Sequence, residues 1–149
     1  YKKDKTYELY KLTIDNNKCL LCKPKTYMNL SGVAVSNVIN FYKIPLSKMI
    51  VVHDDLDLEV GKIKIKIGGG NGGHNGLQDI DKSVGKNYKR IRIGIGHPGS
   101  KNLVSDYVLN KFLSEDRKII DNKIKLLTLN FPLIFKGDNH LLNKLSLIQ

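Results

Sequence analysis

The sequence lacks any apolar run approaching the ~20 residues that a membrane helix needs, although 41% of its 149 residues are hydrophobic. Its first ten residues are charged and contain no apolar stretch, so they do not read as a signal peptide. The chain also lacks an initial Met and opens inside a polar stretch. We therefore expect no membrane partner, one domain with a core of its own, and a missing N-terminal segment.

Acidic residues are scarce. Only 14 Asp and Glu stand against 25 Lys and Arg, which gives a formal net charge of +11. Such a charge attracts a polyanion and speeds encounter with it, so it favours a nucleic-acid partner. A coding bias toward Lys, Asn and Ile explains the same composition, since only three of the basic residues are Arg. Charge alone does not say which nucleic acid is bound.

Cysteine is nearly absent. Cys19 and Cys22 form a C-x-x-C pair in a predicted strand, Lys18–Cys22, where residues three apart point to opposite faces. No helix follows to lower the pKa of a thiol, and no second pair completes a zinc site. We expect two packing cysteines, whose free thiols suit a reducing cytoplasm.

The order of the predicted elements is mixed, which favours the α/β class. A helix begins near Ser31 and ends before Pro45, a second follows Asn75, a third begins at Ser114, and a last short helix covers Leu141–Ile148. The predicted strands are Tyr7–Ile14, Lys18–Cys22, Met49–Val52, Lys62–Ile67 and Lys89–Ile95. Because the chain has neither repeats nor linkers, we expect residues 1–149 to form one domain.

Two of these strands alternate basic and apolar residues. Lys62–Ile67 places three Lys on one face and three Ile on the other, and Lys89–Ile95 places Arg90 and Arg92 opposite its Ile residues. Same-face neighbours lie roughly 6.6–6.8 Å apart, so each strand could present a row of cations to a phosphate backbone. The solvated outer face of a half-buried sheet shows the same pattern, and these residues alone favour that interpretation.

The stretch Lys23–Gly32 joins a strand to a helix and contains Tyr27, Met28 and Asn29. Such loops project side chains from the edge of an α/β sheet. These three offer an aromatic face, a soft apolar contact and an amide that both donates and accepts hydrogen bonds. The set could hold a base or a peptide group, or it could be an ordinary connecting loop.

A second stretch, Ile50–Asp57, is an apolar strand that ends abruptly in acids: Asp54, Asp55 and Asp57. Open α/β sheets bind ligands at this carboxyl edge. One carboxylate there could orient a histidine and stabilise its charged form. Three could instead bind Mg²⁺, or the acids could have no role.

The third stretch, from Gly68 to Leu77, has five glycines in its first six positions. This composition predicts positive φ or a close approach of the backbone to another group. A dinucleotide fingerprint is disfavoured, because the stretch follows a Lys-rich strand and Arg90 and Arg92 stand where that motif has an acid. His74 could be a base, a metal ligand or, as the safest prediction, a residue that orders the loop. Asn75 could hydrogen-bond a substrate carbonyl or a water.

Together these stretches resemble the bacterial-type peptidyl-tRNA hydrolases. The segments Lys23–Val35, Val51–Ile80 and Arg90–Phe112 match the family in order and spacing. The resemblance implies hydrolysis of the ester between a peptide and the terminal ribose of tRNA, which recycles tRNA from stalled translation without a metal or cofactor. It also implies a single α/β domain, with a twisted mixed β-sheet and helices on both faces.

By the same resemblance, Asp54 orients the catalytic base, while Asn29 and Asn75 bind the tRNA end and position the attacking water. Tyr27 and Met28 line the site. His74 supports its loop. The family's tRNA-phosphate contacts fall on Lys64, Lys66 and Arg92.

The sequence differs from the family at the catalytic base. Family members open with a strand, a Gly-Asn-Pro-Gly-type loop and a Thr-Arg-His-Asn stretch whose His takes the proton from water. Nothing here matches those segments, and none of the four histidines inherits the role by position. We therefore expect this chain to lack the family's first strand. General-base catalysis raises a reaction rate about 10²–10⁴-fold, so we expect the chain by itself to be nearly inactive.

The alternative is a catalytically inactive RNA-binding relative that keeps only the basic strands. Retention of Asp54, Asn29 and Asn75 argues against it, because pure binding has little need for an acid that orients a base.

No long apolar stripe is left over once the core is assigned, so we expect a monomer.

Overall fold

The computed structural model describes residues 2–137, 140 and 144. Its strands are β1 (Lys2–Lys3), β2 (Tyr7–Ile14), β3 (Asn17–Pro24), β4 (Ile50–Asp55), β5 (Ile63–Ile67) and β6 (Lys89–Gly94). Its α-helices are α1 (Ser31–Tyr42), α2 (Asn75–Val84), α3 (Val104–Leu109), α4 (Ser114–Leu129) and α5 (Phe131–Lys136), and its 3₁₀ turns are η1 (Met28–Leu30), η2 (Leu46–Lys48) and η3 (Lys101–Leu103). The predicted helix over Leu141–Ile148 falls, except for Lys144, outside the described residues.

The chain divides into two compact units, each built from two segments. The first comprises Tyr1–Ile50 and Ile67–Lys89, and the second comprises Val51–Lys66 and Arg90–Gln149. The expectation that residues 1–149 form one domain stays a prediction.

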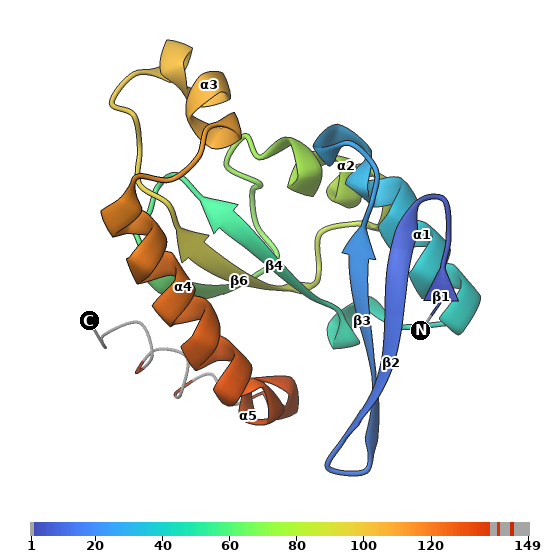
Figure 1. The fold of residues 1–149 in the computed structure, drawn as a ribbon. Helices are drawn as coiled ribbons and strands as arrows, with labels where there is room; N and C mark the ends of the chain where they lie inside the picture. The colour runs from blue at the N-terminus through green and yellow to red at the C-terminus, as the bar shows by residue number, and fades with distance from the viewer. Residues whose placement is uncertain (1, 138–139, 141–143, 145–149) are drawn as a thin grey trace. The chain divides into compact units, whose positions relative to one another are not determined.

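In the first unit, β1, β2 and β3 form an antiparallel sheet (Figure 1). The turn between β2 and β3 has only two residues, Asp15 and Asn16, both at positive φ, 47° and 63°. Such turns match the twist of a hairpin and suit Asp and Asn. Tyr7 and Leu9 of β2 pack against Ala34 and Val38 of α1 and form the core of this unit.

Both ends of α1 follow the sequence signals. The helix begins at Ser31, and after Tyr42 the chain turns through Lys43 in the left-handed conformation, φ 53°. The N–H of Ile44 then donates to the carbonyl of Ile39 at 2.9 Å, which satisfies one of the carbonyls left over at the helix end. The predicted helix and its stop before Pro45 are confirmed.

The second sheet has the strand order β4-β6-β5. Two backbone hydrogen bonds join β4 and β6: Lys89 N–H donates to Met49 O (3.1 Å), and Ile95 N–H donates to Asp55 O (3.0 Å). The residue numbers increase in the same direction along both strands, so β4 and β6 are parallel. Gly94 N–H donates to Lys62 O at 2.8 Å and Gly68 N–H to Tyr88 O at 3.2 Å, so β5 runs antiparallel to β6. The sheet is therefore mixed, and the predicted α/β class is confirmed.

Strand β6 lies in the middle of this sheet, which corrects one expectation. Arg90, which we expected in an outward row of cations, is only 2% exposed, and Ile91 beside it is also 2% exposed. Arg90 and Ile91 are neighbours in β6 and point to opposite faces of the sheet, so both faces are covered at this place. The predicted basic row of β6 is thus wrong for Arg90.

The two cysteines lie in β3, as predicted. Cys19 pairs with Leu12 and Cys22 with Leu9, on opposite faces of the strand, and both thiols are free. Burial raises the pKa of both, which makes them poor nucleophiles and metal ligands.

Among the described residues, no helix is long and apolar enough to cross a membrane.

Candidate functional site

The first unit brings the Tyr27–Asn29 loop against the start of α2. The loop forms η1, closed by a bond from Leu30 N–H to the carbonyl of Tyr27 at 2.9 Å and by Ser31 Oγ, which donates to the carbonyl of Met28 at 2.8 Å. Tyr27 is 84% exposed and Met28 58%, and Asn29 is exposed as well. The turn therefore presents three consecutive side chains to solvent.

Close packing of η1 on α2 depends on Gly76. A Cβ at this position would lie 2.5 Å from Met28 Sδ, so a larger residue could not sit there unless Met28 moved. Asn29 follows Met28 in the chain, and Asn75 precedes Gly76. The contact thus brings together the backbone positions of two exposed amide side chains that are 46 residues apart in sequence.

His74 is the N-cap of α2. Its Nδ1 accepts hydrogen bonds from the N–H groups of Gly76 at 3.1 Å and Leu77 at 3.2 Å, two of the donors that a helix start leaves unpaired. The prediction that His74 orders its loop agrees with this geometry. Asn75 is the first residue of the helix and is exposed.

The glycine-rich loop before His74 is held by a residue that the sequence reasoning passed over, Asn71. Asn71 Oδ1 accepts from Gly73 N–H at 3.1 Å, and its Nδ2 donates to Asp81 of α2 at 3.3 Å. Gly68, Gly69, Gly72 and Gly73 all have positive φ, between 62° and 79°, as the glycine content predicted. An Asn followed two residues later by a Gly is the signal that could have identified this turn.

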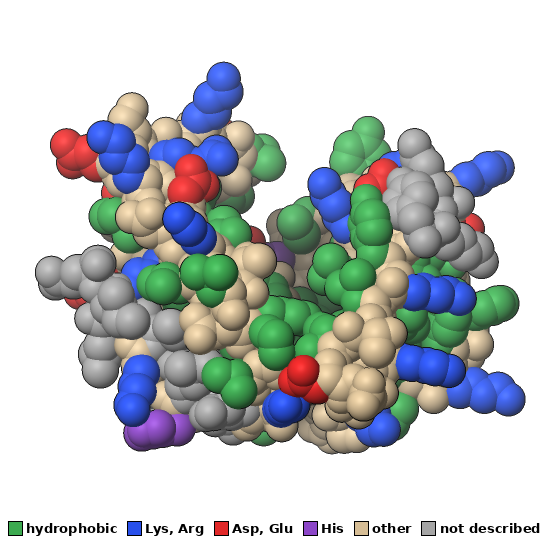
Figure 2. Space-filling model, turned by 60° about the horizontal axis from the view of Figure 1, so that its bottom comes forward, with side chains coloured by type: hydrophobic (Ala, Val, Ile, Leu, Met, Phe, Trp, Pro, Cys, Tyr) green, Lys and Arg blue, Asp and Glu red, His purple; other side chains and the backbone are tan. Residues whose placement is uncertain are grey.

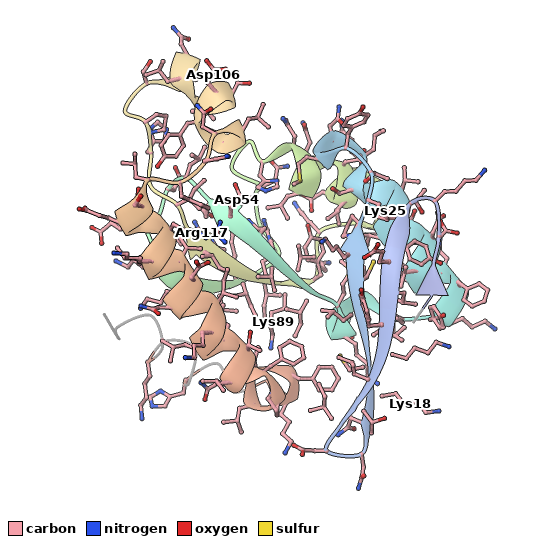
Figure 3. The ribbon with its side chains drawn as sticks, in the orientation of Figure 1. Lys18, Lys25, Asp54, Lys89, Asp106 and Arg117 are labelled. Carbon is pink, nitrogen blue, oxygen red and sulfur yellow. The ribbon has the colours of Figure 1, made fainter. Side chains whose placement is uncertain are left out.

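The second unit contains the acids of β4. Asp54 lies near the carboxyl end of the strand, half-buried (Figure 3). The Nδ1 atom of His53 is 2.6 Å from the backbone carbonyl of Asp54. Asp55, the last residue of the strand, receives a hydrogen bond from Arg92 Nε to its Oδ2 at 2.7 Å. The remaining acid, Asp57, is exposed.

The electrostatics of Asp55 follow from this contact. Burial would raise its pKa, but hydrogen bonds from Arg92 and the Asp57 amide, together with the charges of Arg92 and His53, outweigh it and hold the pKa below the ordinary value. Asp55 is therefore ionised at neutral pH. Within the part of the chain that the structure describes, no group of three or more His, Cys, Asp or Glu is arranged to hold a metal ion.

The three predicted phosphate ligands also belong to the second unit. Lys64 of β5 is exposed, Lys66 is half-buried, and Arg92 is engaged with Asp55. Figure 2 shows many Lys and Arg side chains over the face in view, with few acids among them. The structure thus assembles the predicted site in two groups, one in each unit: Tyr27, Met28, Asn29, His74 and Asn75 in the first, and Asp54, Lys64, Lys66 and Arg92 in the second.

Comparison with known proteins identifies the family. The family model described as peptidyl-tRNA hydrolase matches residues 1–148. The chain is 52% identical over 130 residues to the peptidyl-tRNA hydrolase of Rickettsia bellii (strain RML369-C), covering 87% of this chain and 70% of the relative. It is 50% identical to that of Rickettsia prowazekii (strain Madrid E), covering 91% of this chain and 73% of the relative.

Solved structures agree. The crystal structure of peptidyl-tRNA hydrolase from Acinetobacter baumannii matches 99% of this chain and 77% of its own, with a TM-score of 0.92 and 38% sequence identity. With the family model over nearly the whole sequence and relatives at about half identity, this chain belongs to the peptidyl-tRNA hydrolase family.

Proposed function

We propose that Asn29, Asn75 and Asp54 take part in hydrolysis of the ester of peptidyl-tRNA. Membership of the peptidyl-tRNA hydrolase family supports the reaction and the substrate. In this scheme the two amides bind the tRNA end and position the attacking water. Asp54 orients the histidine of the family's Thr-Arg-His-Asn stretch, which residues 1–149 do not contain, and stabilises the imidazolium that forms when this base takes a proton from that water.

The contact between Met28 and Gly76 carries the proposal. It brings η1 to the start of α2, so that one exposed amide stands on each side of the contact. An amide both donates and accepts hydrogen bonds, so a pair can hold a ribose hydroxyl or ester oxygen while accepting from a water. Tyr27, which is 84% exposed, adds an aromatic face on which a terminal base can stack.

Hydrolysis of an N-blocked aminoacyl-tRNA tests these roles, measured on this chain joined to a segment that carries the family's Thr-Arg-His-Asn stretch, because residues 1–149 do not contain that histidine. Asn29→Ala, Asn75→Ala and Asp54→Asn are compared with Asn40→Ala, an exposed amide on α1 of the first unit that serves as the matched control. We expect Asp54→Asn to lower kcat about 10²–10⁴-fold while tRNA still binds, because the base is misoriented but the binding groups remain. We expect Asn29→Ala and Asn75→Ala to raise KM as well as to lower kcat, and Asn40→Ala to change neither.

Unchanged turnover in Asp54→Asn would remove this residue from the mechanism. Normal kinetics in both amide variants would show that η1 and the start of α2 are not the substrate site.

The monomeric state and the cytoplasmic location expected from the sequence belong to the same proposal, and sedimentation of the purified chain tests the first of them.

A further inference from the structure

The glycine-rich loop before α2 has little side-chain packing to hold it. A Cβ placed on Gly70 or on Gly73 would meet no atom within 4 Å. Glycine also loses more conformational freedom on folding than any other residue. The order of this loop therefore depends mainly on hydrogen bonds.

Tyr88, the residue before β6, holds the loop at two places. Its backbone carbonyl accepts from Gly68 N–H, at the start of the loop, at 3.2 Å. Its hydroxyl donates to Asp81 Oδ1 of α2 at 2.8 Å, and Asp81 Oδ2 accepts from Asn71 Nδ2, in the middle of the loop, at 3.3 Å. Because Tyr88 is 0% exposed, close packing fixes the position of its hydroxyl.

Asn71 also holds the chain just before α2. Its Oδ1 accepts from Gly73 N–H and its backbone carbonyl accepts from His74 N–H, both at 3.1 Å. His74 in turn caps α2 and directly precedes Asn75. A continuous network of hydrogen bonds thus runs from the buried Tyr88 hydroxyl to the residue beside Asn75.

This network lies outside the core cluster of the first unit, which β2 and α1 form. Segments with few packed contacts open locally at low free energy, whereas core elements open only with the whole fold. Loss of one hydrogen bond in the network should therefore move the loop before it unfolds the unit.

We propose that Tyr88, Asp81 and Asn71 position Asn75 for the reaction by holding the glycine-rich loop through this network. The inference rests on the role proposed for Asn75. The three are positioning residues, because they act through Asn75. A displacement of about 1 Å at a catalytic group can cost about 10²-fold in rate, so small movements of the loop have large effects.

The test uses this chain joined to the segment with the histidine stretch, and N-blocked aminoacyl-tRNA as the substrate. Asn71→Asp keeps an acceptor for Gly73 N–H but sets a second carboxylate against Asp81, and Asp81→Ala removes the link altogether. We expect each to lower kcat/KM about 10–10²-fold, through both a raised KM and a lowered kcat, as in Asn75→Ala. Tyr88→Phe, which removes only the hydroxyl, should have a smaller effect in the same direction.

The matched control is Asn17→Ala. Asn17 also holds a turn with its side chain, since its Nδ2 donates to the carbonyl of Asp15 at 3.0 Å. That turn joins β2 to β3 and lies at the end of the hairpin away from α2 (Figure 1). Both kinetic constants should stay within about twofold of the wild-type values, as is usual for a surface substitution. Thermal unfolding sets an assay temperature at which every variant is folded.

Exchange of the two polar side chains provides a rescue. In the double variant Asn71→Asp, Asp81→Asn, the amide at position 81 can donate to the carboxylate at position 71 and accept from the Tyr88 hydroxyl. The network is then complete with its polarity reversed. We expect this double variant to recover most of the kcat/KM that Asn71→Asp loses.

A double-mutant cycle separates positioning from a general weakening of the fold. If the network acts through Asn75, Asp81→Ala should lower kcat/KM no further once Asn75→Ala is present. A weakened fold would lower it equally in both backgrounds. Additive losses in the cycle, or no recovery in the exchanged pair, would overturn the inference.

Amide hydrogen exchange in the same joined chain tests the anchoring without turnover. The amides of Gly73 and His74 should exchange faster in Asn71→Asp and Asp81→Ala than in Asn17→Ala, and unchanged rates would contradict the inference. Normal kinetics in the network variants beside an impaired Asn75→Ala would overturn the inference alone. Full activity of Asn75→Ala would overturn the role proposed for that residue, and the inference with it.

Discussion

At the scale of single residues, His74 shows how a hydrogen-bond pattern limits the chemistry of a side chain. Its Nδ1 accepts two backbone N–H groups, so the neutral ring carries its proton on Nε2. A ring in this state cannot take a proton at Nε2. Protonation of Nδ1 would remove the acceptor that caps α2. The geometry therefore disfavours His74 as the general base.

Replacement of His74 tests this interpretation. His74→Ala should lower the free energy of unfolding by about 1 kcal/mol, whereas His74→Asn should keep most of it, because Asn is among the best N-cap residues. Denaturant unfolding measures both. A His74→Asn variant that kept its stability but lost hydrolysis would show that the ring does more than cap the helix.

Asp55 makes stability depend on pH at the acidic end. Its pKa in the fold lies below the ordinary value of 3.8, so the unfolded chain binds this proton more readily. The resulting stabilisation is complete above the ordinary pKa and is lost as pH falls through the lower folded value. We expect the difference in unfolding free energy between wild type and Asp55→Asn to shrink below about pH 4. Urea unfolding at several pH values measures it, and a constant difference would contradict the assignment.

At the scale of elements, the packing of α1 on α2 depends on Gly32. Its N–H donates to Asp79 Oδ2 of α2 at 2.7 Å, and a Cβ there would collide with Ser83 Oγ and with the backbone carbonyl of Asp79. A backbone atom cannot swing aside as a side chain can. The two helices would have to separate.

Gly32→Ala should therefore destabilise the protein by about 1–3 kcal/mol, even though Ala favours helices. The matched control is Gly70→Ala, because a Cβ at Gly70 meets no atom within 4 Å. Thermal unfolding compares the two variants. Equal melting temperatures would mean that the helices can shift at little cost.

At the scale of the whole molecule, the net charge of +11 should make tRNA binding depend steeply on salt. Lys64→Gln should reduce the slope of log K against log salt by about 0.7–0.9, the contribution of one phosphate contact. Lys18→Gln is the matched control, because Lys18 is exposed near the turn of the β2–β3 hairpin (Figure 3). Binding titrations at several salt concentrations decide whether Lys64 is a phosphate ligand or one charge among many.

The sequence by itself determined the local elements. It placed β2 at Tyr7–Ile14, the first residue of α1 at Ser31 and that of α4 at Ser114, all as observed. Alternation and helical spacing arise from the backbone repeat, so they can be read within one segment. Two helices, α3 and α5, were not predicted; each has only six residues, too few for a clear period.

Only the tertiary structure decided which distant residues meet. It buried Arg90 in the central strand, joined Asp55 to Arg92 across 37 positions, and brought Met28 against Gly76. No local pattern encodes these contacts, because strand order and the approach of one backbone to another follow from packing of the whole chain. The family resemblance could name Asp54, Asn29 and Asn75 as candidates. The ion pair between Asp55 and Arg92 could not be predicted, because it depends on β4 and β6 being neighbours in the sheet.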